Sequence, residues 1–152
     1  NIAGLFYRAF VNEKLLRYNF ARLDYQNLLV LVPGNFQAQL GLALLNEKDK
    51  HYTEAYDGIN SLIEQYPDSA MAYAARGGME KERGMLELAE FDYAKAMELD
   101  AGNEDFAFNH VDILILLGRK DEAYRDLKKL LDAGCQPGRL QGFYARLKKK
   151  KM

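Results

Sequence analysis

The chain has 152 residues, of which 49% are hydrophobic and 28% charged, and its formal net charge is −1. This composition is ordinary for a folded domain and excludes an intrinsically disordered chain. A single cysteine, Cys135, excludes an internal disulfide framework. The longest apolar runs, such as residues 28–33 and 113–117, are far shorter than the ~18 residues of a membrane-spanning helix, so no membrane span is expected.

No secretory signal is visible in the sequence. The chain begins at Asn1 and not at Met, which indicates a processed or trimmed product. The compartment therefore stays open: the protein is cytoplasmic by default, or exported with a targeting segment removed.

Apolar residues recur at helical spacing along the whole chain, and only three prolines interrupt it. The pattern predicts nine helices in chain order, near residues 2–14, 18–31, 36–47, 52–65, 70–83, 86–99, 104–117, 120–133 and 138–149. The first of these is apolar nearly all round, with Ile2, Tyr7 and Phe10 on different sides. We therefore hypothesise that another repeat or a partner protein contacts this N-terminal helix.

The strongest signal is an internal period of 34 residues, which indicates a repeat architecture. Four alanines stand one period apart, at Ala21, Ala55, Ala89 and Ala123. A large apolar residue follows each alanine after four positions, at Tyr25, Ile59, Tyr93 and Leu127. The residues that interrupt helices repeat with the same period, as Pro33 and Pro67 and as Gly84 and Gly118. Small residues allow close approach of two helices, and stacking of the resulting hairpins stabilises the array.

On these residues the chain resembles the tetratricopeptide repeat, a helix–turn–helix unit of 34 residues. Residues 70–103 match best, with Tyr73 at the aromatic position, Gly77 at the small position and Gly84 at the turn. The resemblance implies repeats at about 2–35, 36–69, 70–103 and 104–137 in one domain, residues 1–152. It also implies an all-α fold, a right-handed α-solenoid of antiparallel helix pairs closed by a C-terminal capping helix at about 138–150.

The predicted capping helix is amphipathic, with Leu140, Phe143 and Leu147 on its inner face. Its end is strongly basic through the lysines of residues 148–151. Such a tail either contacts anionic lipid or nucleic acid, or is a solvated helix end that complements the helix dipole. We favour the solvated end and expect no nucleic-acid partner.

In the tetratricopeptide family the first helices of the hairpins line a concave groove that holds ligands. By register, the resemblance places eight residues of this chain in that groove, namely Phe6, Phe10, Leu40, Leu44, Met71, Lys81, Phe108 and Asp112. Most are apolar, which suits a peptide or an amphipathic helix as ligand. The alternative is that these apolar side chains belong to the core, because a shift of one residue in register would turn them inward.

Some relatives bind the C-terminal carboxylate of chaperones through lysines, arginines and asparagines on the first helices. Apolar residues such as Phe10 and Leu44 occupy the matching positions here, so we expect no such binding.

Few residues suggest catalysis. His51 and His110 form no metal-binding pair, and neither an HExxH nor a CxxC pattern occurs. We therefore predict no catalytic residue, no metal and no cofactor. Arg8, Arg76 and His110 share one repeat position and form a candidate polar ladder, with Glu80 as a partner for Arg76. Cys135 is expected to be a free thiol in a turn.

The sequence thus predicts a protein–protein interaction scaffold and not an enzyme. Its partner is expected to be a protein or a peptide that lies in the concave groove. The alternative is a regulatory or docking fragment of a larger enzyme or of a cell-envelope assembly.

Overall fold

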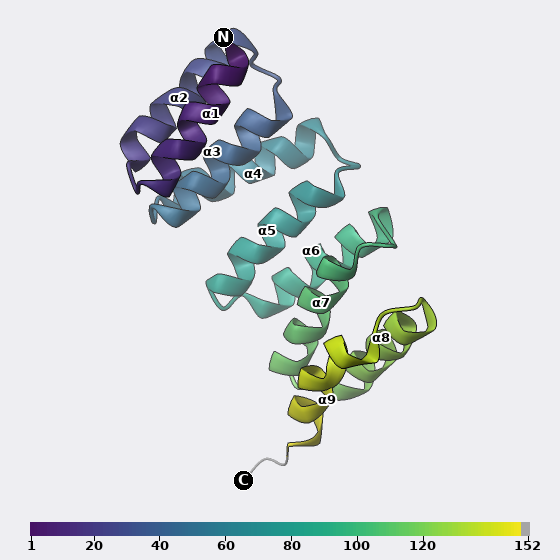
Figure 1. Cartoon of the computed structure of the whole chain (residues 1–152). Coiled ribbons are helices and arrows are strands. Elements are labelled where there is room, and N and C mark those ends of the chain that lie inside the picture. Colours follow the sequence, from purple (N-terminus) through teal and green to yellow (C-terminus); the bar gives the residue numbers. More distant parts are fainter. Residues whose placement is uncertain (150–152) are drawn as a thin grey trace. The chain divides into compact units, whose positions relative to one another are not determined.

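A computed structural model describes residues 1–149, and it is all helical over that range (Figure 1). Its α-helices are α1 (Ile2–Lys14), α2 (Tyr18–Leu31), α3 (Phe36–Lys48), α4 (Tyr52–Gln65), α5 (Ala70–Glu82), α6 (Leu86–Leu99), α7 (Glu104–Leu116), α8 (Lys120–Asp132) and α9 (Gln141–Lys148). The first eight agree with the predicted helices to within one residue at each end. The ninth begins later than predicted, because Pro137–Leu140 forms a turn of 3₁₀ helix before α9.

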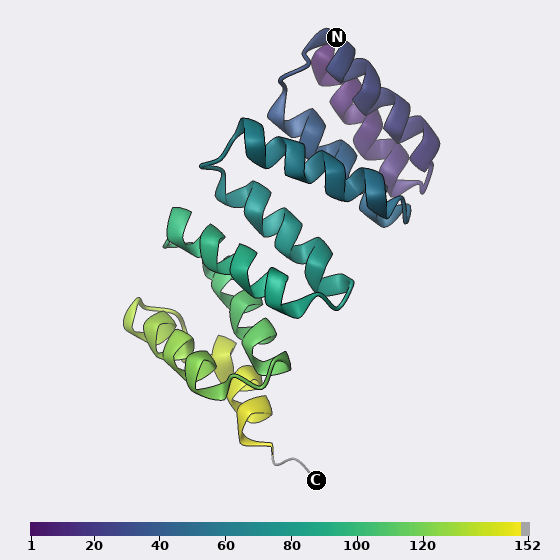
Figure 2. The same cartoon turned by 180° about the vertical axis from the view of Figure 1, so that it is seen from behind.

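The chain divides into two compact units, residues 1–76 and 77–152, and the division falls within α5. In the N-terminal unit, α1 and α2 form one antiparallel hairpin and α3 and α4 form the next, with α2 packed on α3 (Figures 1 and 2). In the C-terminal unit α7 packs against both α6 and α8, and α9 packs against α7. Consecutive antiparallel helix pairs are thus the building block of the fold.

The repeated alanines lie where two helices cross. Ala21, Ala55, Ala89 and Ala123 are all completely buried. Leu28 and Leu62, which stand seven residues after the first two alanines, are also buried in the core. The 34-residue period therefore marks the buried stripe of the second helices, because a small side chain there lets the paired helix approach.

The period also fixes how the first helices begin. The residues before α1, α3, α5 and α7 are polar and stand one period apart, at Asn1, Asn35, Ser69 and Asn103. Each side-chain oxygen accepts a hydrogen bond from the backbone N–H three residues later, at distances of 2.8–3.2 Å. These bonds satisfy donors that a helix N-terminus otherwise leaves unpaired.

The turns inside the hairpins repeat as well, but with different residues in the two units. Gly84 and Gly118 adopt φ angles of 76° and 77° in the C-terminal unit. Leu16 and Lys50 hold the same turn position in the N-terminal unit with φ angles of 60° and 62°. Left-handed backbone is costly for a residue with a side chain, whereas glycine adopts it readily.

Candidate functional site

An apolar hollow lies between α1, α2 and α3 in the N-terminal unit. It has a volume of about 320 Å³ and is lined by Phe6, Tyr25, Gln37, Leu40, Gly41 and Leu44. Phe6, Leu40 and Leu44 were predicted to face the groove. Tyr25, one of the large apolar residues that follow the repeated alanines, forms one wall of the hollow.

Gly41 and Tyr25 shape this hollow together. A Cβ atom at Gly41 would lie 2.6 Å from Cε1 of Tyr25, so only glycine allows the ring to pack against α3 at this distance. The phenol oxygen of Tyr25 donates a 2.9 Å hydrogen bond to Glu13, whose carboxylate is also 3.8 Å from the ammonium of Lys48. Burial, and then the Glu13 carboxylate, raise the pKa of Tyr25, so the phenol stays neutral and is held in place.

The predicted groove residues of this unit differ in exposure. Phe10, Leu44 and Met71 are 54%, 36% and 51% exposed, whereas Leu40 is only 6% exposed and Phe6 is half-buried against the core of the first hairpin. Lys14 covers the Phe10 ring at 5.3 Å from its centroid. Met71 is not part of the hollow's lining. That these residues bind a ligand stays a prediction.

The predicted groove residues of the C-terminal unit are covered by the chain itself. Phe108 lies 5.9 Å from the ring of Phe143 in α9, and the guanidinium of Arg139 sits 4.6 Å from the Phe108 centroid. Lys81 and Arg146 each approach Asp112 to 2.5 Å, and Lys81 also donates to Asn109 at 3.3 Å.

Asp112 therefore has two cationic partners. Burial alone would raise its pKa, but the hydrogen bonds from Lys81 and Arg146 outweigh burial and lower it. Lys81 and Asp112, both predicted to face a ligand, contact each other. The sequence prediction did not include Arg139 and Phe143 as neighbours of Phe108, or Arg146 as a neighbour of Asp112.

The 34-residue period does indicate these neighbours, because it continues into α9. Phe143 stands one period after Asn109, at the position that Gly41 occupies in α3. Phe108 likewise corresponds to Phe6, and Arg146 to Leu44. Helix α9 thus takes the place of a further first helix. The place that is hollow beside Gly41 in the N-terminal unit holds the Phe143 ring in the C-terminal unit.

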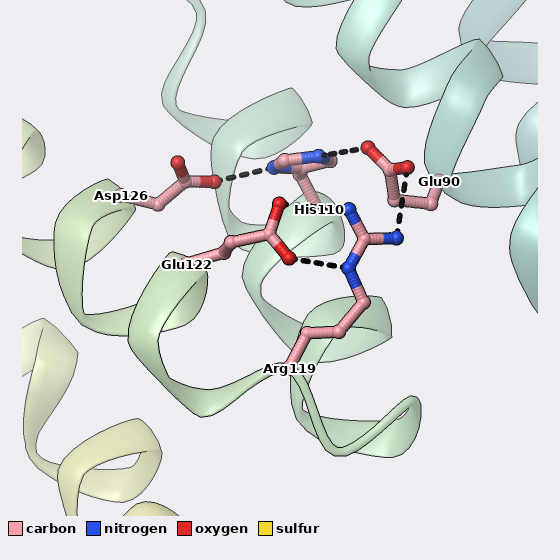
Figure 3. A network of polar contacts seen from close by, with 5 residues as sticks. All are labelled: Glu90, His110, Arg119, Glu122 and Asp126. Carbon is pink, nitrogen blue, oxygen red and sulfur yellow. Dashed lines mark hydrogen bonds and ion pairs between the residues drawn. The ribbon is translucent and has the colours of Figure 1, made fainter.

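A second cluster, the polar network of the C-terminal unit, joins α6, α7 and α8 (Figure 3). Nε2 of the largely buried His110 lies 2.8 Å from Glu90, and Nδ1 lies in close contact with Asp126. Arg119, at the N-terminus of α8, donates to Glu90 at 3.2 Å and to Glu122 at 2.7 Å. The hydrogen bond from Arg119 is the main cause that lowers the pKa of Glu122.

Two members of the candidate polar ladder pair across a hairpin, and the third pairs with the preceding helix. Arg8 donates to Asp24 at 2.9 and 2.7 Å, in the same relation as His110 to Asp126. Arg76 donates to Asn60 of α4 at 3.0 Å; its hypothesised pairing with Glu80 stays a prediction. The second repeat departs from the ladder, since Leu42 and Gly58 stand at the paired positions.

Chemistry-bearing residues are few in the part of the chain that is described. No group of three or more His, Cys, Asp or Glu residues within 1–149 is arranged to hold a metal ion. Cys135 is a buried free thiol, and burial followed by the Glu104 carboxylate raises its pKa. A raised thiol pKa disfavours the reactive thiolate.

The termini carry two further sequence predictions. At the N-terminus, Ile2 and Tyr7 are exposed while Leu5 and Phe6 pack on the first hairpin. In the capping helix, Leu140 and Leu147 are buried and Phe143 packs on the same core, as the inner face predicted. Lys148 and Lys149 are exposed, and Lys150 and Lys151 lie outside the described residues. None of the described helices combines the length and the apolarity that crossing a bilayer requires.

Paired helices with small buried residues every 34 positions define the fold as that of the tetratricopeptide repeat. Solved structures with this fold are similar to the chain. TTC0263, a tetratricopeptide-repeat protein of Thermus thermophilus, is 20% identical with a TM-score of 0.75, over 97% of this chain and 81% of its own.

Two further structures place the fold in different settings. The first tetratricopeptide domain of Spaghetti (RPAP3), bound to the HSP90 peptide SRMEEVD, is 21% identical with a TM-score of 0.67, over 77% of this chain and 93% of its own. An O-GlcNAc transferase of Thermobaculum terrenum is 18% identical with a TM-score of 0.65, over 74% of this chain but only 22% of its own. No protein-family model and no curated protein sequence matches the chain.

Proposed function

We propose that the chain is a protein-binding scaffold whose N-terminal unit holds an apolar segment of a partner protein. The hollow beside Gly41 carries this proposal, because it is apolar and open and is lined by the partly exposed Leu44. Phe10, which stands one helical turn after Phe6 in α1, is exposed as well. Exposed apolar concavities of this kind mark interaction sites. The tetratricopeptide fold generally mediates protein–protein interactions, and one similar structure is bound to a peptide.

The repeat register supports a large side chain as the group that enters the hollow. In the C-terminal unit the equivalent place is occupied by the Phe143 ring, which packs on Phe108. Phe6 offers the same kind of surface in the N-terminal unit. A Phe, Leu or Met side chain of the partner would gain about 1.5–3 kcal/mol from such burial.

The partner is expected to lie along the groove as an extended peptide or as one face of an amphipathic helix. Lys14 and Lys48 stand beside the apolar side chains, but Lys48 faces Glu13 and Lys14 lies over Phe10. Capture of a C-terminal carboxylate is therefore not part of the proposal, although the similar RPAP3 domain is bound to a peptide with an acidic end.

A selection from a random peptide library displayed on phage tests the proposal. We expect the selected peptides to share a large apolar residue. Phe10→Ser combined with Leu44→Ser should weaken their binding at least about tenfold, the equivalent of about 1.4 kcal/mol, in a fluorescence polarisation assay. Val30→Ser is the matched control, because Val30 is 79% exposed but does not line the hollow.

Two outcomes decide between groove and core. If the double variant is folded by circular dichroism and binds undiminished, the hollow is not the binding site. If it loses its helical signal while Val30→Ser keeps it, the side chains belong to the core and the proposal fails.

The second candidate function is a docking or regulatory part of a larger enzyme or of a cell-envelope assembly. The similarity to a small share of an O-GlcNAc transferase chain supports the enzyme form of this candidate. Affinity capture from native extract, with mass spectrometry and the double variant for comparison, separates the candidates. Capture with one enzyme or envelope complex in fixed stoichiometry favours the second candidate.

A further inference from the structure

His110 links helices of two successive repeats. Its imidazole in α7 lies between Glu90 of α6, which belongs to the third repeat, and Asp126 of α8, which belongs with α7 to the fourth (Figure 3). Both ring nitrogens therefore face a carboxylate. The ring is largely buried, so water does not substitute for either partner.

The protonation of the ring decides how many of these bonds exist. A neutral imidazole carries one N–H, whereas the imidazolium carries two. With both carboxylates ionised, only the imidazolium donates to Glu90 and Asp126 at once. A neutral ring would present a lone pair to one of the two carboxylates, which is repulsive.

The two carboxylates are not equivalent. The second oxygen of Glu90 accepts from Arg119 at 3.2 Å, so Glu90 keeps a cationic partner when His110 loses its charge. Asp126 has His110 as its hydrogen-bond partner among the described residues. When the imidazolium loses one proton, the remaining proton is therefore best retained on Nδ1, facing Asp126. The hydrogen bond from Nε2 to Glu90 is then lost.

We propose that His110 is a protonation-controlled joint between the third and fourth repeats. In its charged form it ties α6 to α7 and α8. In its neutral form it keeps the bond within the fourth repeat and releases the bond to the third. The joint does not depend on the groove proposed above, so either proposal can fail without the other.

The charges around the ring set the direction of the pH dependence. Burial lowers the pKa of His110, but the hydrogen bonds to Asp126 and Glu90 outweigh burial and raise the pKa above its ordinary value of 6.5. Glu122, Arg119 and Arg125 complete the charged surroundings from α8 and its N-terminus. Because the folded pKa is raised, the stabilisation is fully present below pH 6.5 and is lost as the pH rises through the folded pKa.

Nitrogen-15 NMR of the imidazole rings tests the joint directly on the whole chain. We expect His110 to titrate above 6.5 and, once neutral, to keep its proton on Nδ1. His51→Gln assigns the signals, because the chain has only two histidines. Asp126→Asn should bring the pKa of His110 down. A His110 that titrates at or below 6.5, or that keeps its proton on Nε2 when neutral, overturns the proposal.

Urea unfolding between pH 6 and pH 9 provides the second measurement. As the pH rises, the unfolding equilibrium constant of the wild type should increase relative to that of His110→Gln. The increase should be about tenfold for each unit by which the pKa of His110 in the folded chain exceeds its pKa in the unfolded chain. His51→Gln is the matched control, since the ring of His51 is about half exposed. A parallel pH dependence in wild type and His110→Gln, or an equal loss of it in His51→Gln, contradicts the joint. If His110→Gln does not fold, the NMR titration of the wild type still decides.

Discussion

One repeat position carries the smallest side chain in the N-terminal unit and a large aromatic side chain in the C-terminal unit. In the N-terminal unit Gly41 leaves an apolar hollow beside Phe6, whereas in the C-terminal unit Phe143 fills the equivalent place beside Phe108. Ion pairs from Lys81 and Arg146 to Asp112 then cover what would be the adjoining groove surface. One repeat therefore supports either an open surface or a closed one, depending on a few residues in the first helix of the repeat that follows it.

The outer sides of the second helices, in contrast, differ from one repeat to the next and not from one unit to the other. In α2, Phe20 and Leu23 are 63% and 51% exposed. Their equivalents in α8 are Glu122 and Arg125. The same two positions are apolar and exposed in α6, at Leu88 and Phe91, and charged in α4, at Glu54 and Asp57, so each unit has one apolar and one charged second helix on this side. On α1 itself Tyr7 and Phe10 are exposed, in line with the hypothesis that another repeat or a partner contacts the N-terminal helix.

The largest expected effect comes from weakening the packing of α9 on the core of the C-terminal unit. Leu147→Ala removes a buried side chain through which α9 packs on the core of the C-terminal unit. We expect a loss of about 2–5 kcal/mol in the free energy of unfolding, measured by urea denaturation. Lys148→Ala is the matched control at the next, exposed position. Equal unfolding midpoints for the two variants would show that α9 does not close the unit.

A smaller effect is expected from filling the hollow beside Gly41 in the N-terminal unit. Gly41→Phe should clash with Tyr25 and cost about 1–3 kcal/mol. Adding Tyr25→Leu copies the arrangement of Leu127 and Phe143 and should restore most of the stability. The double variant should be folded yet no longer bind the selected peptides. Full peptide binding by that variant would contradict the equivalence of the two places.

The smallest effect concerns two helical glycines. A Cβ at Gly58 would meet only Ala43, at an ordinary 3.6 Å, so Gly58→Ala should stabilise the chain by about 0.5–1 kcal/mol. A Cβ at Gly77 would lie 2.9 Å from the buried ring of Tyr93, so Gly77→Ala should destabilise it. Thermal unfolding of both variants measures the contrast. The same sign for both would show that close packing at Gly77 is not limiting.

The 34-residue period made the fold predictable, because each alanine, proline and glycine signal recurs and the errors of single positions cancel. The start of α9 was the exception. Pro137 begins a 3₁₀ turn there, and the amphipathic pattern of Leu140, Phe143 and Leu147 continues smoothly through it. Periodicity alone does not distinguish one turn of 3₁₀ helix from α-helix.

The site was less predictable than the fold. The register gave the face on which Phe10, Leu44 and Asp112 lie, but not whether that face is open. Openness depends on what packs opposite, and the amphipathic pattern of α9 predicts only that it covers the core. The polar partners were missed for a similar reason. The sequence pattern predicts a partner one helical turn away from Arg76, whereas Arg8 and His110 pair across the hairpin, with Asp24 and Asp126.

The turns of the N-terminal unit have a consequence for its motion. Leu16 and Lys50 hold left-handed backbone where the C-terminal unit has glycine, and each such residue costs about 1–2 kcal/mol. Hydrogen exchange in the hairpins of α1–α2 and α3–α4 should therefore proceed through openings of lower free energy than in α7–α8. A ligand bound in the hollow would suppress those openings by mass action, so slowed exchange of these amides would report occupancy before the partner is known.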